Sequence, residues 1–481
     1  MARLDLLRPY QSKAAKELAR REKVGLWCAA GTGKTATILA AYAMVGAPKP
    51  YLVVTRALGR GVWPRDARWL LGEYYSPAIL LGNSVKGDGY HGNGSYSCLE
   101  QALLAHIGVV ISYDVLRGRI GELSRIPWKV MILDEAHLVK SGHLPLQLNR
   151  QGKPHYTRFH FAQRLSRDVH YRGGLVLEAT ATPIKDRPRD LWGQLDLVLP
   201  GQFGTAWSFL KRYCDSHYGE YGLVTTGLSN ADELRERLAK HFVKVTREEI
   251  ADQLPSLTRS IVEIEKDEGA VEKWGGGVEN SIAMAAQMKF TSAVELAADY
   301  LNTRGKVVCV VNRRRLVPQL YQRFEKLRKK VLTRDTNSTV NVIAVSGEME
   351  AMKRAAELDA FNEGPSPAIC FATIDCLSES INLHKCDACF VLSLPYTHGL
   401  LDQLEGRFAR LGGISSEIQY LIVRDTIDER IRELLLDKQE KIVNVSAGTT
   451  NVAAAHEDFA MTARDSEVLA ELRDWLNKGE E

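Results

Sequence analysis

Uninterrupted runs of apolar residues recur along the chain, and a turn and a helical pattern follow most of them. In the first half, these runs cover residues 25–30, 51–55, 109–112, 130–133 and 175–179. A strand that is apolar at successive positions is buried on both faces, which is typical of a parallel sheet covered by helices. We therefore predict an α/β domain in this half of the chain.

A second set of apolar runs lies nearer the C-terminus. These runs cover residues 307–311, 340–345, 368–373, 389–394 and 420–423. They predict a second parallel sheet, so the fold expected is α/β with two domains of the same kind.

The interval between the two sets lacks such runs and carries helical patterns, for example at 231–241. We expect it to form a mostly helical insertion. The expected divisions of the chain are residues 1–200, 201–280, 281–444 and a C-terminal tail at 445–481.

The tail at 445–481 is acidic, with eight acidic and three basic side chains. Helical spacing would gather its apolar side chains on one face. These are Val468, Leu469, Leu472, Trp475 and Leu476. Two interpretations stay open: a helix docked on the body of the protein, or a segment that docks a protein partner or regulates the chain.

The composition is that of an ordinary globular protein, with 481 residues, 45% hydrophobic, 25% charged, and a net charge of +4. No apolar run has the length of a signal-peptide core or a membrane span. Cys309, Cys370 and Cys389 lie in apolar runs, which suits buried thiols in a reducing compartment. We expect no membrane association and a cytoplasmic or nuclear location.

Residues 28–35 form a glycine-containing loop between a predicted strand and a predicted helix. Such a loop directs backbone N–H groups and the positive end of the helix toward an anion. Lys34 would add a cation for the β- and γ-phosphates of ATP, and Thr35 a hydroxyl for Mg²⁺. The predicted phosphate-binding residues are Gly31, Thr32, Gly33, Lys34 and Thr35.

The run Asp134-Glu135-Ala136-His137 follows another predicted strand. Ligands of open α/β sheets bind at the carboxyl ends of the strands, so these side chains belong at the site. Asp134 is predicted to hold the Mg²⁺ shell, and Glu135 to orient and polarise the attacking water.

The run from Gln403 to Arg410 lies in the second domain and places Arg407 and Arg410 three residues apart. On a helix, this spacing puts both arginines on one face. Guanidinium groups can spread the charge of a transferring phosphoryl group, so the pair is predicted to be catalytic.

In this order, the motifs resemble those of superfamily 2 helicase-like ATPases, specifically the Snf2-type double-stranded DNA translocases. The middle of the chain resembles the annealing-helicase (HepA-related) branch of that family. Further matching segments are 7–11 (Q motif), 53–55 (motif Ia), 111–113 (motif Ib), 180–184 (motif III), 310–313 (motif IV) and 380–383 (motif V).

The resemblance implies two RecA-like domains that bind ATP and Mg²⁺ and hold duplex DNA. It assigns Gln11 and Gln403 to the nucleotide. The residues implied for coupling are His137, Thr180, Thr182 and Asn382. Those implied for the DNA backbone are Thr55, Arg56, Ser112, Asn312, Arg313 and Thr373.

The function expected is an ATP-dependent motor that translocates along double-stranded DNA or remodels it, with fork remodelling or strand annealing implied by the branch. We expect a monomeric motor, associated with the nucleoid in a prokaryote or virus and nuclear in a eukaryote. The alternatives are an RNA or single-stranded DNA helicase and an ATP-gated clamp that binds DNA with a protein partner. Ser380, which stands where motif V usually has glycine, and the acidic tail favour the clamp.

Overall fold

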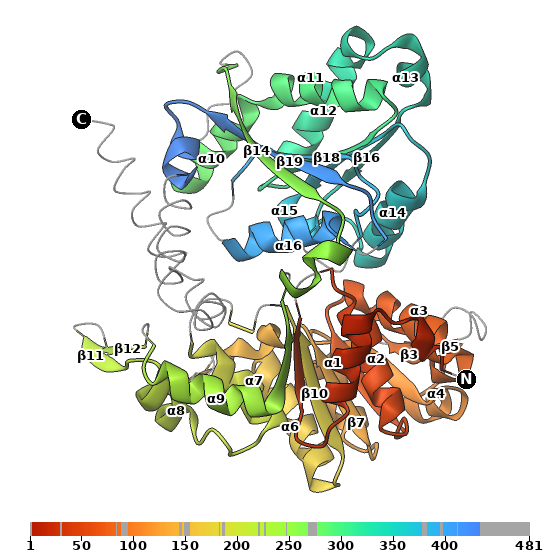
Figure 1. Cartoon of the computed structure of the whole chain (residues 1–481), viewed down its shortest axis with the longest axis vertical. Coiled ribbons are helices and arrows are strands. Elements are labelled where there is room, and N and C mark those ends of the chain that lie inside the picture. The colour runs from red at the N-terminus through yellow and green to blue at the C-terminus, as the bar shows by residue number, and fades with distance from the viewer. Residues whose placement is uncertain are drawn as a thin grey trace. The chain divides into compact units, whose positions relative to one another are not determined.

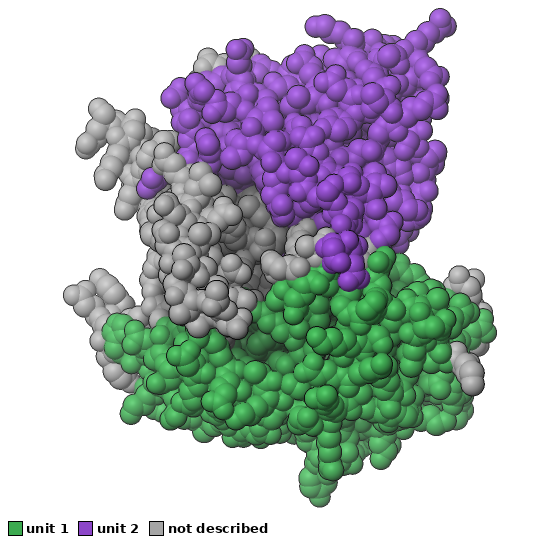
Figure 2. All heavy atoms as spheres, in the orientation of Figure 1, with its two compact units in different colours: residues 1–250 green, residues 251–481 purple. Residues whose placement is uncertain are grey.

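The computed structural model divides the chain into two compact units, residues 1–250 and 251–481, which Figure 2 colours separately. Residues 2–432 are described, except for 29–30, 83, 88–94, 144–146, 149–153, 182, 185–187, 220–221, 226–227, 247, 268–276, 378–381, 395–397 and 411. The predicted tail at 445–481 therefore lies outside the described residues. Within the described part, no helix is long and apolar enough to cross a membrane.

Unit 1 is built on a nine-stranded sheet that is parallel except at one edge. In spatial order, its strands are β13 (Phe242–Val245), β1 (Gly25–Cys28), β10 (Leu175–Thr180), β7 (Val130–Asp134), β2 (Tyr51–Thr55), β6 (Gly108–Ser112), β3 (Ala78–Leu80), β4 (Val85–Lys86) and β5 (Ser95–Tyr96). The parallel strands end at a shared carboxyl edge, where the predicted motifs gather.

Helices cover both faces of this sheet (Figure 1). One layer contains α1 (Pro9–Leu18), α2 (Lys34–Met44) and α3 (Val62–Leu71), and the other contains α5 (Leu116–Leu123), α6 (Arg158–Tyr171) and α7 (Asp190–Val198). Further helices are α4 (Leu99–Ala105), α8 (Ala206–Tyr213) and α9 (Ala231–His241). The short helices are η1 (Leu4–Leu6), η2 (Leu58–Gly61), η3 (Glu73–Tyr75) and η4 (Ala136–His143). Two antiparallel ribbons are also present: β8 (Gln147–Leu148) pairs with β9 (Pro154–His155), and β11 (His217–Gly219) pairs with β12 (Gly222–Val224).

Unit 2 contains a six-stranded sheet in which every pair is parallel. Its spatial order is β14 (Leu257–Ile264), β19 (Ser416–Val423), β18 (Ala388–Val391), β15 (Lys306–Val311), β17 (Ala368–Thr373) and β16 (Asn341–Val345). The helices are α10 (Val278–Gln287), α11 (Phe290–Asn302), α12 (Leu316–Val331), α13 (Arg334–Thr339), α14 (Ala351–Glu363), α15 (Ile374–Leu377) and α16 (His398–Phe408), and η5 (Glu248–Gln253) joins the two units. Figure 1 shows α11 and α12 on one face and α15 and α16 on the other.

All ten predicted apolar runs are strands, five in each unit, and the prediction of two α/β domains with parallel sheets is confirmed. The prediction that residues 201–280 lack strands is wrong. Within that interval, β13 pairs with β1 of the first sheet, and β14 pairs with β19 of the second. Both are edge strands, and β14 alternates exposed with half-buried positions, so neither shows the continuous apolar pattern of a central strand.

An ion pair is buried completely in unit 2. Lys289 Nζ lies 2.6 Å from Asp428 Oδ2, and both side chains are 0% exposed. The same ammonium donates to the Leu421 carbonyl at 2.9 Å, and the Val423 N–H donates to Asp428 Oδ2 at 3.2 Å. These bonds tie the start of α11 to the helical residues 427–432 after β19.

Substitution of one partner should leave the other as an uncompensated buried charge. We expect Asp428→Asn to lower the free energy of unfolding by about 3–5 kcal/mol. The matched control is Asp335→Asn, which removes an exposed pair with Arg304 and should cost under about 1 kcal/mol. Urea denaturation measures the free energy of unfolding of both variants. Equal losses of stability would contradict a structural role for the buried pair.

A buried carboxyl group also lies in the sheet of unit 1. Trp27 Nε1 donates to Glu178 Oε1 at 3.0 Å across β1 and β10, and burial raises the pKa of Glu178 to about 7. Gly25 leaves room for this contact, because a Cβ there would lie 2.3 Å from the Phe242 ring and 3.0 Å from Glu178 Cγ.

The raised pKa has a consequence for stability. Between pH 4.5 and about 7, the unfolded chain ionises Glu178 while the folded chain keeps it protonated, so stability falls as pH rises through this window. The loss is about 3 kcal/mol at 1.36 kcal/mol per pKa unit. Glu178→Gln keeps an acceptor for Trp27 and should remove this part of the pH dependence between pH 5 and 8. If the free energy of unfolding had the same pH dependence in the wild type and the variant, the raised pKa of Glu178 would be contradicted.

Candidate active site

The predicted phosphate loop connects β1 to α2. Gly31 and Gly33 have φ values of 83° and 76°, in the left-handed region that favours glycine. A Cβ at Gly33 would lie 2.4 Å from Gln11 Nε2, so a side chain there would displace the Gln11 amide. Lys34 and Thr35 open α2, and no described side chain caps its first turn. The N–H groups of that turn are therefore suited to an anion.

Helix α1 supports the phosphate loop. Gln11 Nε2 and the Tyr10 hydroxyl donate to the Thr32 carbonyl at 3.1 and 2.6 Å. Gln11 Oε1 accepts from the Arg8 N–H at 3.0 Å, which completes the first turn of α1. Gln11, predicted to contact the nucleotide, thus has its side chain directed at the loop that would hold the phosphates.

Asp134 is fixed at the end of β7 by two donors. Thr55 Oγ1 and Trp63 Nε1 both donate to Asp134 Oδ2, at 2.7 and 3.0 Å. Burial and the neighbouring Glu135 raise the pKa of Asp134, and the two hydrogen bonds oppose that rise. One carboxylate oxygen is thereby anchored to β2 and α3, so the carboxylate presented to a metal has a fixed orientation.

These contacts correct part of the predicted DNA surface. Thr55 is fully buried and donates its hydroxyl to Asp134, and Ser112 is buried at the end of β6. In this structure, neither side chain is open to a backbone phosphate, so both are withdrawn from the proposed DNA contacts. Thr55 replaces the proline usual in motif Ia, and its hydroxyl is what makes the bond to Asp134.

Glu135 has a partner different from those of Asp134. Its φ of 52° lies in the left-handed region, which is costly for a residue with a side chain. Its Oε2 lies 3.4 Å from His137 Nδ1, while Asp134 contacts Thr55 and Trp63. Adjacent carboxylates therefore have separate surroundings, as different chemical roles require.

The structure brings together two of the predicted coupling residues. His137 Nδ1 lies 3.0 Å from Thr180 Oγ1 at the end of β10, and both residues are buried. A third, Thr182, lies outside the described residues. Arg56 Nη2 lies 3.2 Å from His137 Nε2, a contact the sequence did not predict.

In unit 2, α16 carries the predicted Gln403 and Arg407 and ends at Phe408. Arg410 lies two residues beyond that end, so the two arginines do not lie on one helix as predicted. Gln403 and Arg407 are buried. Arg410 donates from Nη1 to Asn382 Oδ1 and from Nε to the Gly406 carbonyl at 3.0 Å. The structure thus joins a predicted catalytic arginine to the predicted coupling residue of motif V.

Of the four remaining predicted DNA contacts, Arg56 lies in unit 1, and the other three line one cavity of about 490 Å³ at the carboxyl ends of β15, β16 and β17. It is lined by Asn312, Arg313, Arg314, Arg315, Gly347, Thr373, Asp375 and Cys376. Arg313 also donates to Asn280 Oδ1 at 3.0 Å and to Glu279 Oε2 at 3.1 Å, so α10 orients its guanidinium.

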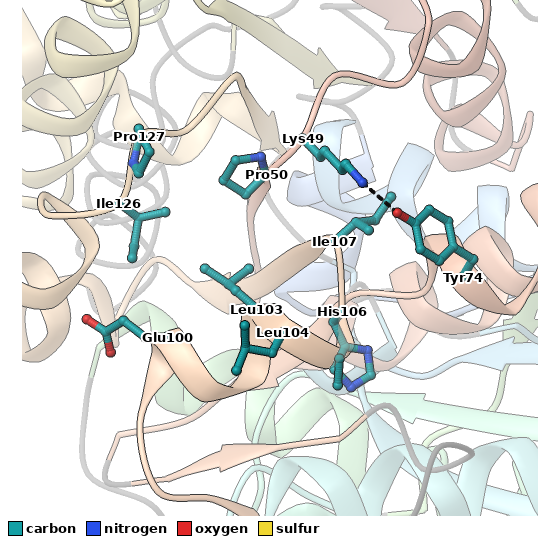
Figure 3. A pocket seen from close by; sticks show the side chains of 11 residues that line it. Lys49, Pro50, Tyr74, Glu100, Leu103, Leu104, His106, Ile107, Ile126 and Pro127 are labelled. Carbon is teal, nitrogen blue, oxygen red and sulfur yellow. Dashed lines mark hydrogen bonds between the residues drawn. The ribbon is translucent and has the colours of Figure 1, made fainter.

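A second hollow, of about 410 Å³, lies in unit 1 (Figure 3). Lys49 and Pro50 precede β2, and His106 and Ile107 precede β6, which places this hollow at the amino ends of the strands. Lys49 Nζ donates to the Tyr74 hydroxyl at 2.7 Å. None of the predicted site residues lines it, as expected for the edge opposite the usual ligand edge of an α/β sheet.

Comparison with known families identifies both units. Residues 30–304 match the SNF2-related domain, and residues 289–412 match the helicase conserved C-terminal domain.

The curated relatives of the chain include longer proteins whose names refer to chromatin or DNA. The "SWI/SNF-related matrix-associated actin-dependent regulator of chromatin subfamily A-like protein 1" of Drosophila melanogaster is 23% identical over 95% of this chain and 58% of its own length. The human "DNA annealing helicase and endonuclease ZRANB3" is 22% identical over 66% of this chain and 30% of its own length. The chain therefore spans less than two thirds of these relatives.

A solved structure shares the fold. Dbp5 of S. cerevisiae, bound to RNA and ADP BeF3, aligns with a TM-score of 0.50 and 13% identity, over 98% of this chain and 97% of that one. The match of the SNF2-related domain covers more than half of the chain, and the predicted Snf2 resemblance is confirmed. The chain belongs to the SNF2-related family of helicase-type ATPases.

Proposed function

We propose that the chain hydrolyses ATP to translocate along or remodel double-stranded DNA. The observation that carries this proposal is the pair Asp134 and Glu135 at the carboxyl end of β7, with each carboxylate held by different partners. The glycine-containing loop and the first turn of α2 follow β1 and lie at this same carboxyl edge of the sheet. This combination suits phosphoryl transfer from a nucleotide to water.

The residues present fit ATP with Mg²⁺. Gly31, Gly33 and the first turn of α2 supply backbone donors, and Lys34 supplies a cation. Thr35 and Asp134 would hold Mg²⁺, which neutralises charge on the β- and γ-phosphates when bound. Glu135 would orient the water and accept its proton as the new P–O bond forms, while the bond between the γ-phosphorus and the β,γ-bridging oxygen breaks and ADP leaves.

Unit 2 supplies the cations that we assign to the γ-phosphoryl group, Arg407 and Arg410. A guanidinium group spreads negative charge in the transition state without a proton transfer. The contact of Arg410 with Asn382 supports a link between hydrolysis and motif V. Gln403 is assigned to the nucleotide because of the resemblance of its segment to Snf2-type ATPases.

We assign the DNA backbone to Arg56 in unit 1 and to the cavity formed by Asn312, Arg313 and Thr373 in unit 2. Contacts of this kind to phosphates give affinity without sequence readout. The similarity to named annealing helicases favours duplex substrates, forks among them. We propose that a single chain acts as the motor, with the acidic tail available to a protein partner, in the compartment that holds the DNA.

Replacement of Glu135 tests the division of labour between the carboxylates. Glu135→Gln should keep ATP and DNA affinity and lose turnover by about 10²–10⁴-fold, because a general base is removed while the fold is kept. Lys34→Ala is the comparison variant and should lose nucleotide affinity. Steady-state ATP hydrolysis and nucleotide binding measure both, and undiminished turnover in Glu135→Gln would remove its assigned role.

Replacement of Arg410 tests the assigned arginine. Arg410→Ala should slow hydrolysis by about 10³-fold at saturating ATP and DNA, as loss of an arginine finger does. Asn382→Ala is the matched control, because it removes the Asn382–Arg410 contact and keeps the guanidinium. If both variants slowed turnover equally, Arg410 would be an anchor for motif V rather than a catalytic group.

The nucleic acid is tested by ATP hydrolysis with duplex DNA, single-stranded DNA, RNA, forks and four-way junctions. We expect the strongest stimulation from duplex-containing DNA. Stimulation by RNA alone or by single strands alone would instead favour a helicase of those substrates.

A further inference from the structure

Arg56 stands between the predicted DNA surface and the catalytic carboxylate. It follows directly after Thr55, the last residue of β2, and its side chain is partly exposed. Its Nη2 lies 3.2 Å from Nε2 of His137, a side chain that is 2% exposed. Arg56 Nε is buried and has no partner among the described residues.

The chemistry of this contact specifies the tautomer of His137. A guanidinium group has five N–H donors and no acceptor, so Nε2 of His137 must accept from Arg56. A neutral imidazole that accepts at Nε2 carries its proton on Nδ1. That nitrogen lies 3.0 Å from Thr180 Oγ1 and 3.4 Å from Glu135 Oε2.

The imidazole ring of His137 therefore contacts residues at the ends of β2, β7 and β10. Arg56 follows β2, Glu135 follows β7, and Thr180 ends β10. These strands lie in the order β10-β7-β2, so His137 bridges three adjacent strand ends. The contact would be lost if residue 56 had no N–H donor or if an anion drew its guanidinium group away.

We propose that Arg56 is a positioning residue that holds His137 in its Nδ1–H tautomer, and that a DNA backbone phosphate, by engaging the same guanidinium, changes how His137 holds Glu135. The inference rests on the proposed function, because it assumes that Glu135 serves hydrolysis and that DNA binds at this edge. It adds a route from the DNA contact to the catalytic carboxylate that passes through one hydrogen bond.

The tautomer can be measured without ATP or DNA. In the full chain labelled with ¹⁵N-histidine, NMR should show His137 protonated at Nδ1 and unprotonated at Nε2. The signal that disappears in His137→Gln is that of His137, which identifies it among the signals of the 12 histidines. Arg56→Met should shift the Nε2 resonance or mix the tautomers, and Arg56→Lys, which keeps a donor, should restore part of the wild-type signal. An Nε2–H tautomer in the wild type, or no change in Arg56→Met, would overturn the proposal.

The coupling is measured as the ratio of ATP turnover at saturating duplex DNA to turnover without DNA. Arg56→Met should lower this ratio by about tenfold, within the usual range for coupling between sites. In the His137→Gln background, the same substitution should lower it no further, because both residues act through one contact. Arg65→Met is the control, since Arg65 is exposed and bonds to its neighbour Asp66.

The outcomes separate the two proposals. A wild type that DNA does not stimulate would contradict the proposed function, whatever the tautomer of His137. A stimulated wild type with an unchanged ratio in Arg56→Met would overturn the inference alone. In that case, a weaker affinity for DNA in the variant would make Arg56 a simple phosphate contact.

Discussion

Two adjacent carboxylates stand at the end of strand β7, each with its own partners, and the site depends on those different partners. Asp134 is the last residue of β7 and contacts Thr55 and Trp63, whereas Glu135 follows the strand with a φ of 52° and lies beside His137. The charge of Glu135 raises the pKa of Asp134, and the hydrogen bonds from Thr55 and Trp63 lower it. With different partners, one carboxylate is suited to a metal ion and the other to water.

The parallel sheet brings the partners of these carboxylates to one place. Strands β1, β10, β7 and β2 are neighbours and end at the same edge, although the segments that follow them are far apart in the sequence. The hydrogen bonds of His137 therefore connect motif II, motif III and the segment after β2. His137 occupies the central position in this set, with Thr180 on one side and Arg56 on the other.

The sequence predicted central strands and motifs better than it predicted contacts. Nine of the ten runs are central strands with a clear apolar signal, and the tenth, β16, is an edge strand with an apolar sequence but partly exposed positions. The edge strands β13 and β14 lacked that signal. The glycine loop, the carboxylate pair and Arg410 were predicted because the chemistry requires those residue types at those spacings. The contacts of Trp63 with Asp134 and of Arg56 with His137 depend on strand order and helix placement, which no local pattern specifies. Thr55 was assigned to DNA by resemblance, and only its burial against Asp134 corrects that assignment.

The central claim is that hydrolysis at this carboxylate pair moves the chain along duplex DNA. Displacement of a third strand from a long duplex measures that movement directly. The account predicts ATP-dependent displacement by the wild type and none by Glu135→Gln, even though that variant still binds both ligands. DNA-stimulated hydrolysis by the wild type without displacement would contradict translocation and would instead favour an ATP-gated clamp.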